Sequence, residues 1–508
     1  MSDEALFWLP LAVVLSSMLP GLCIFALKEE QVLARTILNL AGILTKLGLI
    51  TAMVIGVYRG HIYETRLPLM PGYDLVLHAS ALPILFVVLS AVLWLITTVY
   101  AIGYLEHSPG RSRFFGFFSV CVSATTGIAL SGNLFTFVLF YELLTLATYP
   151  LVVHRGTQEA LRAGRIYLAY TLTGGTILLV AVVWLHALVG PFDFREGGVL
   201  AAQYGEHAPT LMVIFWMMIA GLGVKAALVP LHGWLPVAMV APAPVSALLH
   251  AVAVVKAGAF GVVRVVYDVY GITYVGELGL GQGLVWVASF TIIYGSVRAL
   301  AQDKLKRLLA YSTVSQVAYI ILGVGLVAPL ASVGGVVHLV HQGVMKITLF
   351  FCAGNLAETL GIHRISQMNG VARRMPATMA AFTIGALGMI GVPPLAGFIS
   401  KWFLGMGAME AQQPWVLVIL AASSALNAAY FLPVIFTAYF REPAQPWPLE
   451  GWPGRFETHL SLLLPALITA AMVIAFGLGA SAIWSPLSWV EIVVARIYPG
   501  PSAFSGPP

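Results

Sequence analysis

The feature that most constrains this chain is the recurrence of apolar runs about twenty residues long. A helix of about twenty apolar residues crosses the hydrocarbon core of a bilayer, and an α-helix satisfies its own backbone there. Roughly fourteen candidate spans can be counted, near 5–27, 33–58, 79–104, 114–130, 134–153, 164–189, 210–240, 243–267, 282–300, 308–327, 331–357, 376–410, 415–440 and 459–484. The sequence therefore predicts an all-α polytopic membrane protein with about fourteen transmembrane helices, forming a single membrane domain over residues 1–508.

Charged residues are scarce and unevenly placed. They make up 9% of the chain, whereas about a quarter of a soluble protein is charged. Loops after odd-numbered spans hold sixteen lysines and arginines, and loops after even-numbered spans hold three, Arg59, Arg66 and Arg195. Because basic loops stay in the cytoplasm, we expect both termini on the outer (periplasmic) side of a bacterial cytoplasmic membrane. The net charge of +5 then reflects topology, and we expect no nucleic-acid partner.

The chain offers no recognisable cofactor motif. Its three cysteines, Cys23, Cys121 and Cys352, form no paired pattern typical of an iron–sulfur cluster, a zinc site or a disulfide framework. No dinucleotide-binding or P-loop pattern occurs either. We therefore expect no metal, no cofactor and no catalytic site on this chain. It would be at most one part of a larger translocase, powered by an ion gradient or by a partner.

Proline and glycine interrupt the seventh and twelfth spans. The segment PLHGWL at 230–235 resembles PLAGFI at 394–399, and a lysine lies beside each, Lys225 and Lys401. The two spans are five apart and so cross the membrane in opposite directions, which indicates an inverted repeat with a site near the bilayer midplane. The residues expected to break the helices are Pro230, Gly233, Pro236, Pro393, Pro394 and Gly397.

Several ionisable side chains lie inside the apolar spans. Each costs about 2.5–3.5 kcal/mol at mid-membrane on insertion scales, so their retention favours a function. The candidates for proton translocation are Glu142, Lys225, His250, Lys256, His338, His341, Lys346 and Lys401.

Structural explanations compete with a functional one. Lys46, Lys346 and Arg264 could extend to the membrane surface. Glu142 could form a buried structural ion pair, and His250 could be a hydrogen-bonded helix contact. The two histidines three residues apart in span eleven could bind a metal, but the sequence places no third ligand near them.

Burial gives such groups a way to move protons. Removing a lysine from water favours its neutral form and brings its titration toward neutral pH, and histidine titrates in the same range. An approaching carboxylate restores the charged lysine, and its withdrawal expels the proton. A broken helix supplies free carbonyls and room for water beside the lysine. The pattern predicts a hydrated chain of groups that load and release protons.

Six motifs carry a resemblance to a known family. They are YEL at 141–143, VKAALVPLHGWLPVAM at 224–239, APAPVSALLHA at 241–251, DKLKRLLAYSTVSQ at 303–316, HLVHQGVMKITLFFCAG at 338–354 and GVPPLAGFISKW at 391–402. Over about residues 75–440, the chain resembles the antiporter-like membrane subunits of Mrp-type cation/proton antiporters, respiratory complex I and membrane-bound hydrogenases. The resemblance implies two inverted five-helix repeats, spans 4–8 (111–268) and 9–13 (280–440), after N-terminal helices (1–104) and before a last span with a tail (455–508).

The resemblance also implies residue roles. Glu142 and Lys225 match the pumping pair, His250 and Lys256 the span-eight relay, and the remaining matches are His338 in span eleven and Lys401 as the exit lysine. Relatives commonly have a histidine where this chain has Gln342, so the local route would use His341 or water. A lysine in span twelve and the absence of a long lateral helix favour the D-type branch of the Mrp antiporter subunits.

Three functions fit this pattern to different degrees. The first is a proton-conducting subunit of an Mrp-type Na⁺ or K⁺/H⁺ antiporter, acting with other membrane subunits in the lipid bilayer. The alternative is the same proton channel coupled to an enzyme partner, namely a hydrogenase, an NADH/quinone oxidoreductase complex or an inorganic-carbon uptake or hydration complex. The third, a structural scaffold, would gain nothing from so many intramembrane charges.

Overall fold

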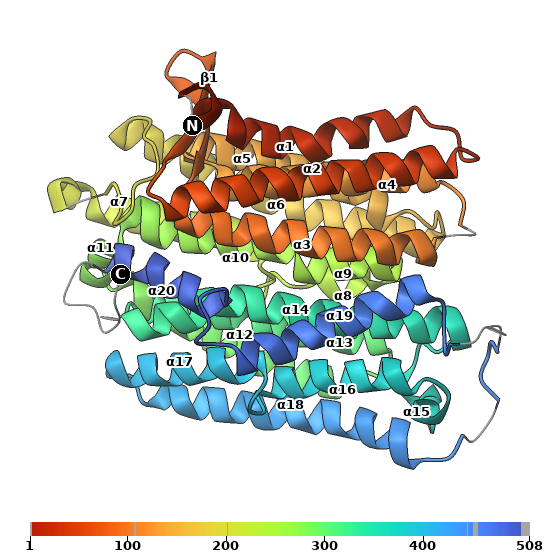
Figure 1. Cartoon of the computed structure of the whole chain (residues 1–508). Helices are drawn as coiled ribbons and strands as arrows, with labels where there is room; N and C mark the ends of the chain where they lie inside the picture. The colour runs from red at the N-terminus through yellow and green to blue at the C-terminus, as the bar shows by residue number, and fades with distance from the viewer. Residues whose placement is uncertain (1–2, 106–107, 201, 444–445, 451–455, 499–508) are drawn as a thin grey trace.

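The apolar runs fold as long helices that lie side by side in one bundle (Figure 1). The computed structural model describes residues 3–105, 108–200, 202–443, 446–450 and 456–498. Within these ranges, thirteen helices are long and apolar enough to cross a membrane. The twelfth expected span consists of two 15-residue helices, α16 (Pro376–Ile390) and α17 (Ala396–Glu410), each too short to cross alone. The expected multi-pass helical fold is confirmed.

The helices follow the expected order. The N-terminal helices are α1 (Asp3–Phe25), α2 (Val32–Tyr58) and α3 (Ala81–Tyr104). The segment expected to form the first repeat holds α4 (Arg111–Leu130), α5 (Leu134–Val152), α6 (Gln158–Val189), α7 (Ala208–Lys225), α8 (Trp234–Val237), α9 (Ala243–Ala251) and α10 (Val254–Arg264).

The second half continues in the same manner. After the short α11 (Ile272–Glu277) come α12 (Leu280–Leu300), α13 (Leu305–Gly325), α14 (Pro329–Leu360), α15 (Val371–Arg374), α16, α17 and α18 (Trp415–Phe440). The chain then forms α19 (Leu460–Leu478) and α20 (Pro486–Ile497). The sequence did not predict α20, because its polar residues break the apolar pattern. Both ends of the described chain lie at the same end of the bundle (Figure 1).

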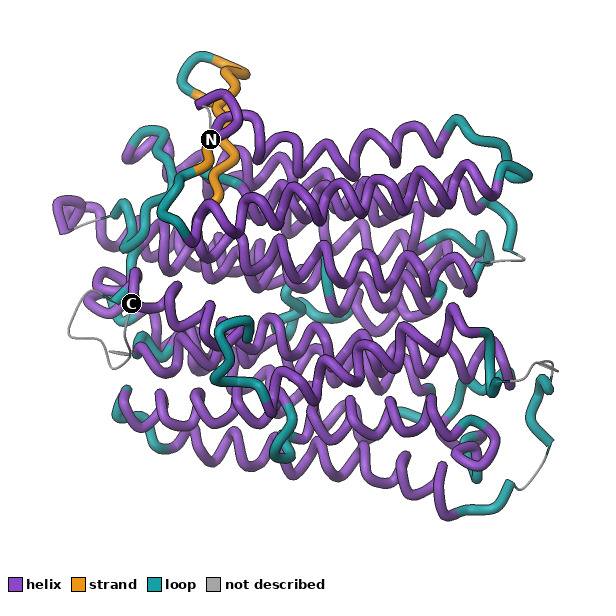
Figure 2. Tube along the Cα trace, in the orientation of Figure 1, coloured by secondary structure: helices purple, strands orange, loops and turns teal. Residues whose placement is uncertain are grey.

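Three spans are interrupted, one more than expected. The breaks in spans seven and twelve are confirmed, and Figure 2 shows loop segments inside the bundle at these places. Span eight also breaks, at Val252 and Ala253 between α9 and α10, and it ends as a π-helix over Val265–Tyr270. No proline or glycine lies at the Val252 break, so composition carried no signal for it.

The polar stretch 59–78 forms a β-hairpin, which the sequence did not predict. Strands β1 (Tyr63–Met70) and β2 (Tyr73–Ala79) pair antiparallel, and Gly72 adopts the left-handed conformation that the turn requires (φ 81°). The hairpin is partly exposed, and its two strands contain too few apolar residues to form a recognisable strand pattern in the sequence.

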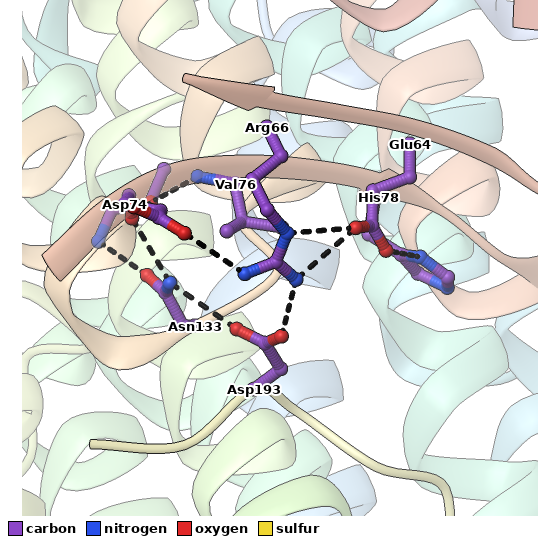
Figure 3. A network of polar contacts seen from close by, with 8 residues as sticks. Glu64, Arg66, Asp74, Val76, His78, Asn133 and Asp193 are labelled. Carbon is purple, nitrogen blue, oxygen red and sulfur yellow. Dashed lines mark hydrogen bonds and ion pairs between the residues drawn. The ribbon is translucent and has the colours of Figure 1, made fainter. Parts of the chain in front are cut away.

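An arginine-centred network ties the hairpin to the bundle (Figure 3). Arg66 lies 3.1 Å from Glu64 and 3.3 Å from Asp74, and it also bonds to Asp193. The hydrogen bond to Asp193 raises the pKa of Arg66. Asn133, at the start of α5, donates to the Asp74 carbonyl at 3.1 Å and so joins the same cluster. The hairpin is therefore fixed to both α5 and the loop after α6.

The opposite end of α5 is followed by a partly buried histidine outside the membrane spans, His154. The His154 ring packs edge-on against Phe114, with centroids 5.2 Å apart. Burial and the nearby charges of Arg113 and Arg155 lower the pKa of His154 to about 4. The imidazole is therefore neutral at pH 7 in the folded chain.

We expect acidification from about pH 7 to about pH 5 to destabilise the folded chain through His154. Between its folded pKa of about 4 and its unfolded pKa of about 6.5, only the unfolded chain takes up a proton there, so stability falls as the pH falls. The His154→Gln variant should lose less of its thermal midpoint in detergent over this range than the parent does. The same change at exposed His61 is the matched control, and equal losses for His154→Gln and parent would contradict the assignment.

Candidate functional site

The candidate proton-carrying residues lie inside the bundle. Lys225, His250, Lys256, His338, His341 and Lys346 are fully buried, while Glu142 and Lys401 are partly buried. Extension to the membrane surface is the wrong explanation for Lys46 and Lys346, which are 0% exposed, and for Arg264, which is 4% exposed.

Lys225 is the last residue of α7. Its ammonium donates a hydrogen bond to the Tyr141 carbonyl of α5 and lies 3.3 Å from the centroid of the Tyr141 ring. The free carbonyls at a helix C-terminus carry partial negative charge, which favours a cation there. Both contacts that the structure shows for the Lys225 ammonium, however, come from Tyr141 of the neighbouring helix α5.

Backbone groups at the break after Lys225 have defined hydrogen-bond partners. The Trp234 indole donates to the Val224 carbonyl at 2.7 Å, and the Leu228 amide donates to the Gly223 carbonyl at 2.9 Å. The Val229 amide donates to the Thr291 hydroxyl of α12 at 3.1 Å. Pro230 and Gly233 lie in this break, whereas Pro236 lies in the short α8 that follows it.

Glu142 neighbours Tyr141 on α5, but its carboxylate does not pair with Lys225 within the 4.0 Å of an ion pair. Its buried Oε1 has no hydrogen-bond partner among the residues that the structure describes. A Cβ atom on Gly175 of α6 would lie 1.8 Å from that oxygen. The glycine therefore leaves the space that the carboxylate occupies.

Span eight packs directly against the C-terminus of α7. A Cβ atom on Gly258 would lie 2.3 Å from the Ala226 amide nitrogen, so α10 and the end of α7 touch backbone to backbone. Two residues earlier on α10, the Lys256 ammonium is buried without a partner among the described groups, as are both ring nitrogens of His250. Buried polar groups of this kind are normally satisfied by ordered water.

In the second half, hydroxyl and amide side chains connect the charged groups directly. The Lys346 ammonium of α14 donates to the Ser312 hydroxyl of α13 at 2.7 Å. The Tyr430 hydroxyl of α18 lies 2.9 Å from the same Ser312 hydroxyl and bonds to the Asn427 side chain. Three helices thus contribute to one continuous hydrogen-bonded chain.

That chain ends at the break in span twelve. Asn427 donates to the Met389 carbonyl at 3.1 Å, and Lys401 of α17 donates to the carbonyls of Met389 at 3.2 Å and Ile390 at 2.7 Å. Lys401 also bonds to Ser424 at 2.8 Å. Lys401 therefore lies against the C-terminus of the preceding half-helix α16, whereas Lys225 is itself the last residue of α7.

The two histidines of α14 hydrogen-bond to side chains near the break in span twelve. His338 shares a hydrogen bond of 3.1 Å with Gln316, whose amide in turn reaches the Met389 carbonyl at 3.5 Å. His341 shares a bond of 3.0 Å with Ser400. Neither side-chain polar atom of Gln342 has a partner among the described residues, so of these three residues only His338 is joined to the Met389 carbonyl, through Gln316.

At the second break, the prolines and the glycine have different structural roles. Pro393 and Pro394 lie in the loop between α16 and α17, while Gly397 lies inside α17. A Cβ atom on Gly397 would lie 1.9 Å from the Gly388 carbonyl oxygen. Gly397 therefore allows close packing of the two half-helices and does not itself interrupt one.

Sequence reasoning missed the neutral members of the site. Ser312 and Gln316 lie within the motif at 303–316 but carry no charge, and Asn427 and Tyr430 lie in an ordinary apolar span. The glycine pair at 174–175, inside a helix, was the available signal for close packing beside Glu142.

Comparison with known proteins identifies the family. The family model described as NADH:quinone oxidoreductase/Mrp antiporter, TM, matches residues 131–427, more than half of the chain. The chain belongs to this family. The matched region contains each of the eight proton-translocation candidates described above. As a member of the NADH:quinone oxidoreductase/Mrp antiporter family, the chain is an antiporter-like membrane subunit.

Individual relatives come from both branches of the family. The chain is 37% identical over 403 residues to the N-type subunit of the NADH-quinone oxidoreductase of Desulforudis audaxviator, covering 77% of this chain and 79% of the relative. It is 27% identical over 410 residues to the D-type subunit of the Na⁺/H⁺ antiporter of Bacillus subtilis, covering 80% and 81%. A chain of the Mrp complex from Dietzia sp. DQ12-45-1b shares the fold, with a TM-score of 0.83 at 24% identity over 98% of both chains.

We expect Gly175→Ala to impair ion-coupled transport by displacing the Glu142 carboxylate. The added methyl group would overlap Oε1, and α6 and α5 cannot separate without disturbing a close-packed interior. Proton flux in proteoliposomes containing the assembled complex measures the effect. Gly48→Ala on α2, where a Cβ meets open space, is the matched control, and equal flux in the two variants would contradict the assigned role of Gly175.

Proposed function

We propose that this protein translocates protons along its buried polar chain as part of an Mrp-type monovalent cation/proton antiporter, in the position of the D-type subunit. The observation that carries the proposal is the hydrogen-bonded connection from Lys346 through Ser312, Tyr430 and Asn427 to the Met389 carbonyl that Lys401 also contacts. Asn427 and the carbonyl hold this route in place, and water beside them would carry the proton across to Lys401. A scaffold has no need for a continuous set of buried donors and acceptors between two lysines.

The first step assigns loading to Glu142 and Lys225. The lysine has a carbonyl and an aromatic face as partners, so it can hold a proton without the carboxylate. Approach of Glu142 would favour the charged amine, and withdrawal toward the space beside Gly175 would favour release. Because the pair is not locked in an ion pair, this step requires only side-chain movement.

The second step carries the proton across the centre. Lys256 and His250 lie on the two halves of the broken span eight, and His250 stacks on Phe350 of α14 at 4.6 Å between centroids. Their unpartnered nitrogens would be joined to Lys346, His338 and His341 by water. A short chain of ordered water conducts protons between such groups without moving the helices.

The last step releases the proton at Lys401. Its ammonium is held by the carbonyls at the end of α16 and by Ser424. Release leaves a neutral amine that can accept the next proton through water beside Asn427. Such subunits act with other membrane subunits, and the cation exchanged for the proton would be Na⁺ or K⁺.

The second candidate function is the same proton channel in a quinone oxidoreductase assembly. It is favoured by one observation, the 37% identity to the N-type subunit of an NADH-quinone oxidoreductase. Purification of the chain with its native partners separates the two candidates. Co-purification of an iron–sulfur or flavin subunit would support the oxidoreductase, and co-purification of antiporter subunits alone would support the Mrp-type assembly.

We expect Glu142→Gln and Lys225→Met each to lower proton flux by about a hundred-fold or more, because each removes a positioned proton-transfer group. Flux is measured in proteoliposomes with the assembled complex, and assembly is checked by co-purification of the partners. Exposed Glu159→Gln and Lys304→Met are the matched controls and should keep parental flux. Parental flux in an assembled Glu142→Gln complex would refute the loading step.

We also infer that the hairpin end of the bundle faces the periplasm of a bacterial cytoplasmic membrane, with both termini there. The inference is supported by the basic loops at the opposite end. Alkaline phosphatase fused at the C-terminus should be active, and a green fluorescent protein fused there through the general secretion route should be dark. The reverse pattern would place the termini in the cytoplasm.

A further inference from the structure

Lys46 is a buried lysine that the pathway described above does not use. It lies in the middle of α2, outside both five-helix repeats and outside the matched family region, and it is 0% exposed. Placing a lysine at mid-membrane costs free energy, so its retention indicates a function or compensating contacts. The groups around Lys46 indicate a function.

Neutral groups from three helices hold the Lys46 ammonium. It donates to the Ser17 hydroxyl of α1 at 2.8 Å and to the Thr126 hydroxyl of α4 at 2.6 Å. It also lies 5.3 Å from the ring centroid of Trp94 on α3. No ion pair within 4.0 Å joins Lys46 to any described carboxylate. The amine can therefore gain or lose a proton without leaving a buried counter-charge unpaired.

A polar seam between α2, α1 and α4 runs from Lys46 toward the basic-loop end of the bundle. Ser17 and Ser123 share a hydrogen bond of 2.7 Å, and Ser119 donates to Asn39 at 3.4 Å. Residues 35, 39 and 46 follow one face of α2, and residues 112, 119, 123 and 126 follow one face of α4, at helical spacing. The whole seam is buried.

The seam reaches the loops at Arg35. Arg35 donates to the Ser112 hydroxyl at 2.8 Å, and Glu29 accepts hydrogen bonds from the Arg111 and Ser112 backbone amides at 2.9 and 3.1 Å. Burial opposes ionisation of Glu29, but these amides and the charges of Arg35 and Arg111 lower its pKa. A carboxylate thus lies at the mouth of the seam.

On α3, Lys46 lies near the ring of Trp94, and Ser90 and Thr98 precede and follow that residue by one helical turn. Ser90, Trp94 and Thr98 are 0% exposed, and the Ser90 hydroxyl, the Trp94 indole N–H and the Thr98 hydroxyl are unpartnered among the described groups. The helix packs against α2 and α4 on one side and against α9 and α14 on the other. These last two helices carry His250 and the unpartnered Gln342. Helix α3 therefore lies between Lys46 and the central chain.

We propose that Lys46 is a second proton-loading residue, fed through the α2–α4 seam and delivering to the central chain across α3. In each cycle, the neutral amine takes one proton from the seam. The ammonium then gives one proton to water held by the α3 hydroxyls, and the amine returns to its neutral form. The inference rests on the proposed function and adds an entry separate from the Glu142–Lys225 pair.

The test compares Lys46→Gln with the parent in the assembled complex. Glutamine can hydrogen-bond to Ser17 and Thr126 but cannot carry a proton at neutral pH, so it separates a structural clamp from a relay. We expect normal co-purification and thermal midpoint, with proton flux roughly ten-fold lower. The exposed Lys28→Gln at the same end of the bundle is the matched control and should keep parental flux.

Parental flux in an assembled Lys46→Gln complex would overturn the proposal. If that variant fails to assemble, Trp94→Phe decides, since it keeps a six-membered aromatic ring and removes the indole N–H together with the pyrrole ring. Lower flux with intact assembly would then support delivery across α3, and unchanged flux would overturn it. Loss of flux in Glu142→Gln together with parental flux in Lys46→Gln would refute only this inference, whereas parental flux in Glu142→Gln would refute the loading step of the proposed function itself.

Discussion

A buried ammonium requires polar partners, and at Lys401 these partners are carbonyls that an interrupted helix leaves free. Lys401 reaches back to the last carbonyls of α16, whereas Lys225, at the end of α7, donates to the Tyr141 carbonyl of the unbroken helix α5. Without the break in span twelve, those carbonyls would be bonded within the helix and the Lys401 amine would lose two of its partners. The position of the Lys401 charge therefore depends on this break.

The two halves of the protein link their charged and polar groups in different ways. In the second half, Ser312, Tyr430 and Asn427 bridge Lys346 to the α16 carbonyl directly. In the first half, Glu142, Lys256 and His250 have polar atoms without protein partners among the described residues. A directly bonded chain holds its geometry, whereas groups joined by water can change partners at little cost. The stretch from Lys346 to the Met389 carbonyl is therefore held directly by side chains, whereas the groups of the first half are not.

Close backbone contact is the means by which helices bring these groups together. Gly175 leaves space for Glu142, Gly258 lets α10 touch the end of α7, and Gly397 brings α17 against α16. In membranes, small residues at helix contacts replace the hydrophobic driving force that water would provide. The site therefore depends on residues that have no chemistry of their own.

The sequence by itself determined the helical membrane fold, the two proline-marked breaks and the identity of the charged candidates, because each leaves a local mark: a long apolar run, a helix-breaking residue, or a charge where hydrocarbon is expected. It could not reveal the break at Val252, the hairpin, or Ser312, Asn427 and Tyr430, whose importance comes only from neighbours distant in the chain. Lys46 shows the division most clearly. Its charge is visible in the sequence, but only the packing of α1, α3 and α4 around it decided that the amine stays inside, since burial is a property of the assembled helices and not of the helix that carries the residue.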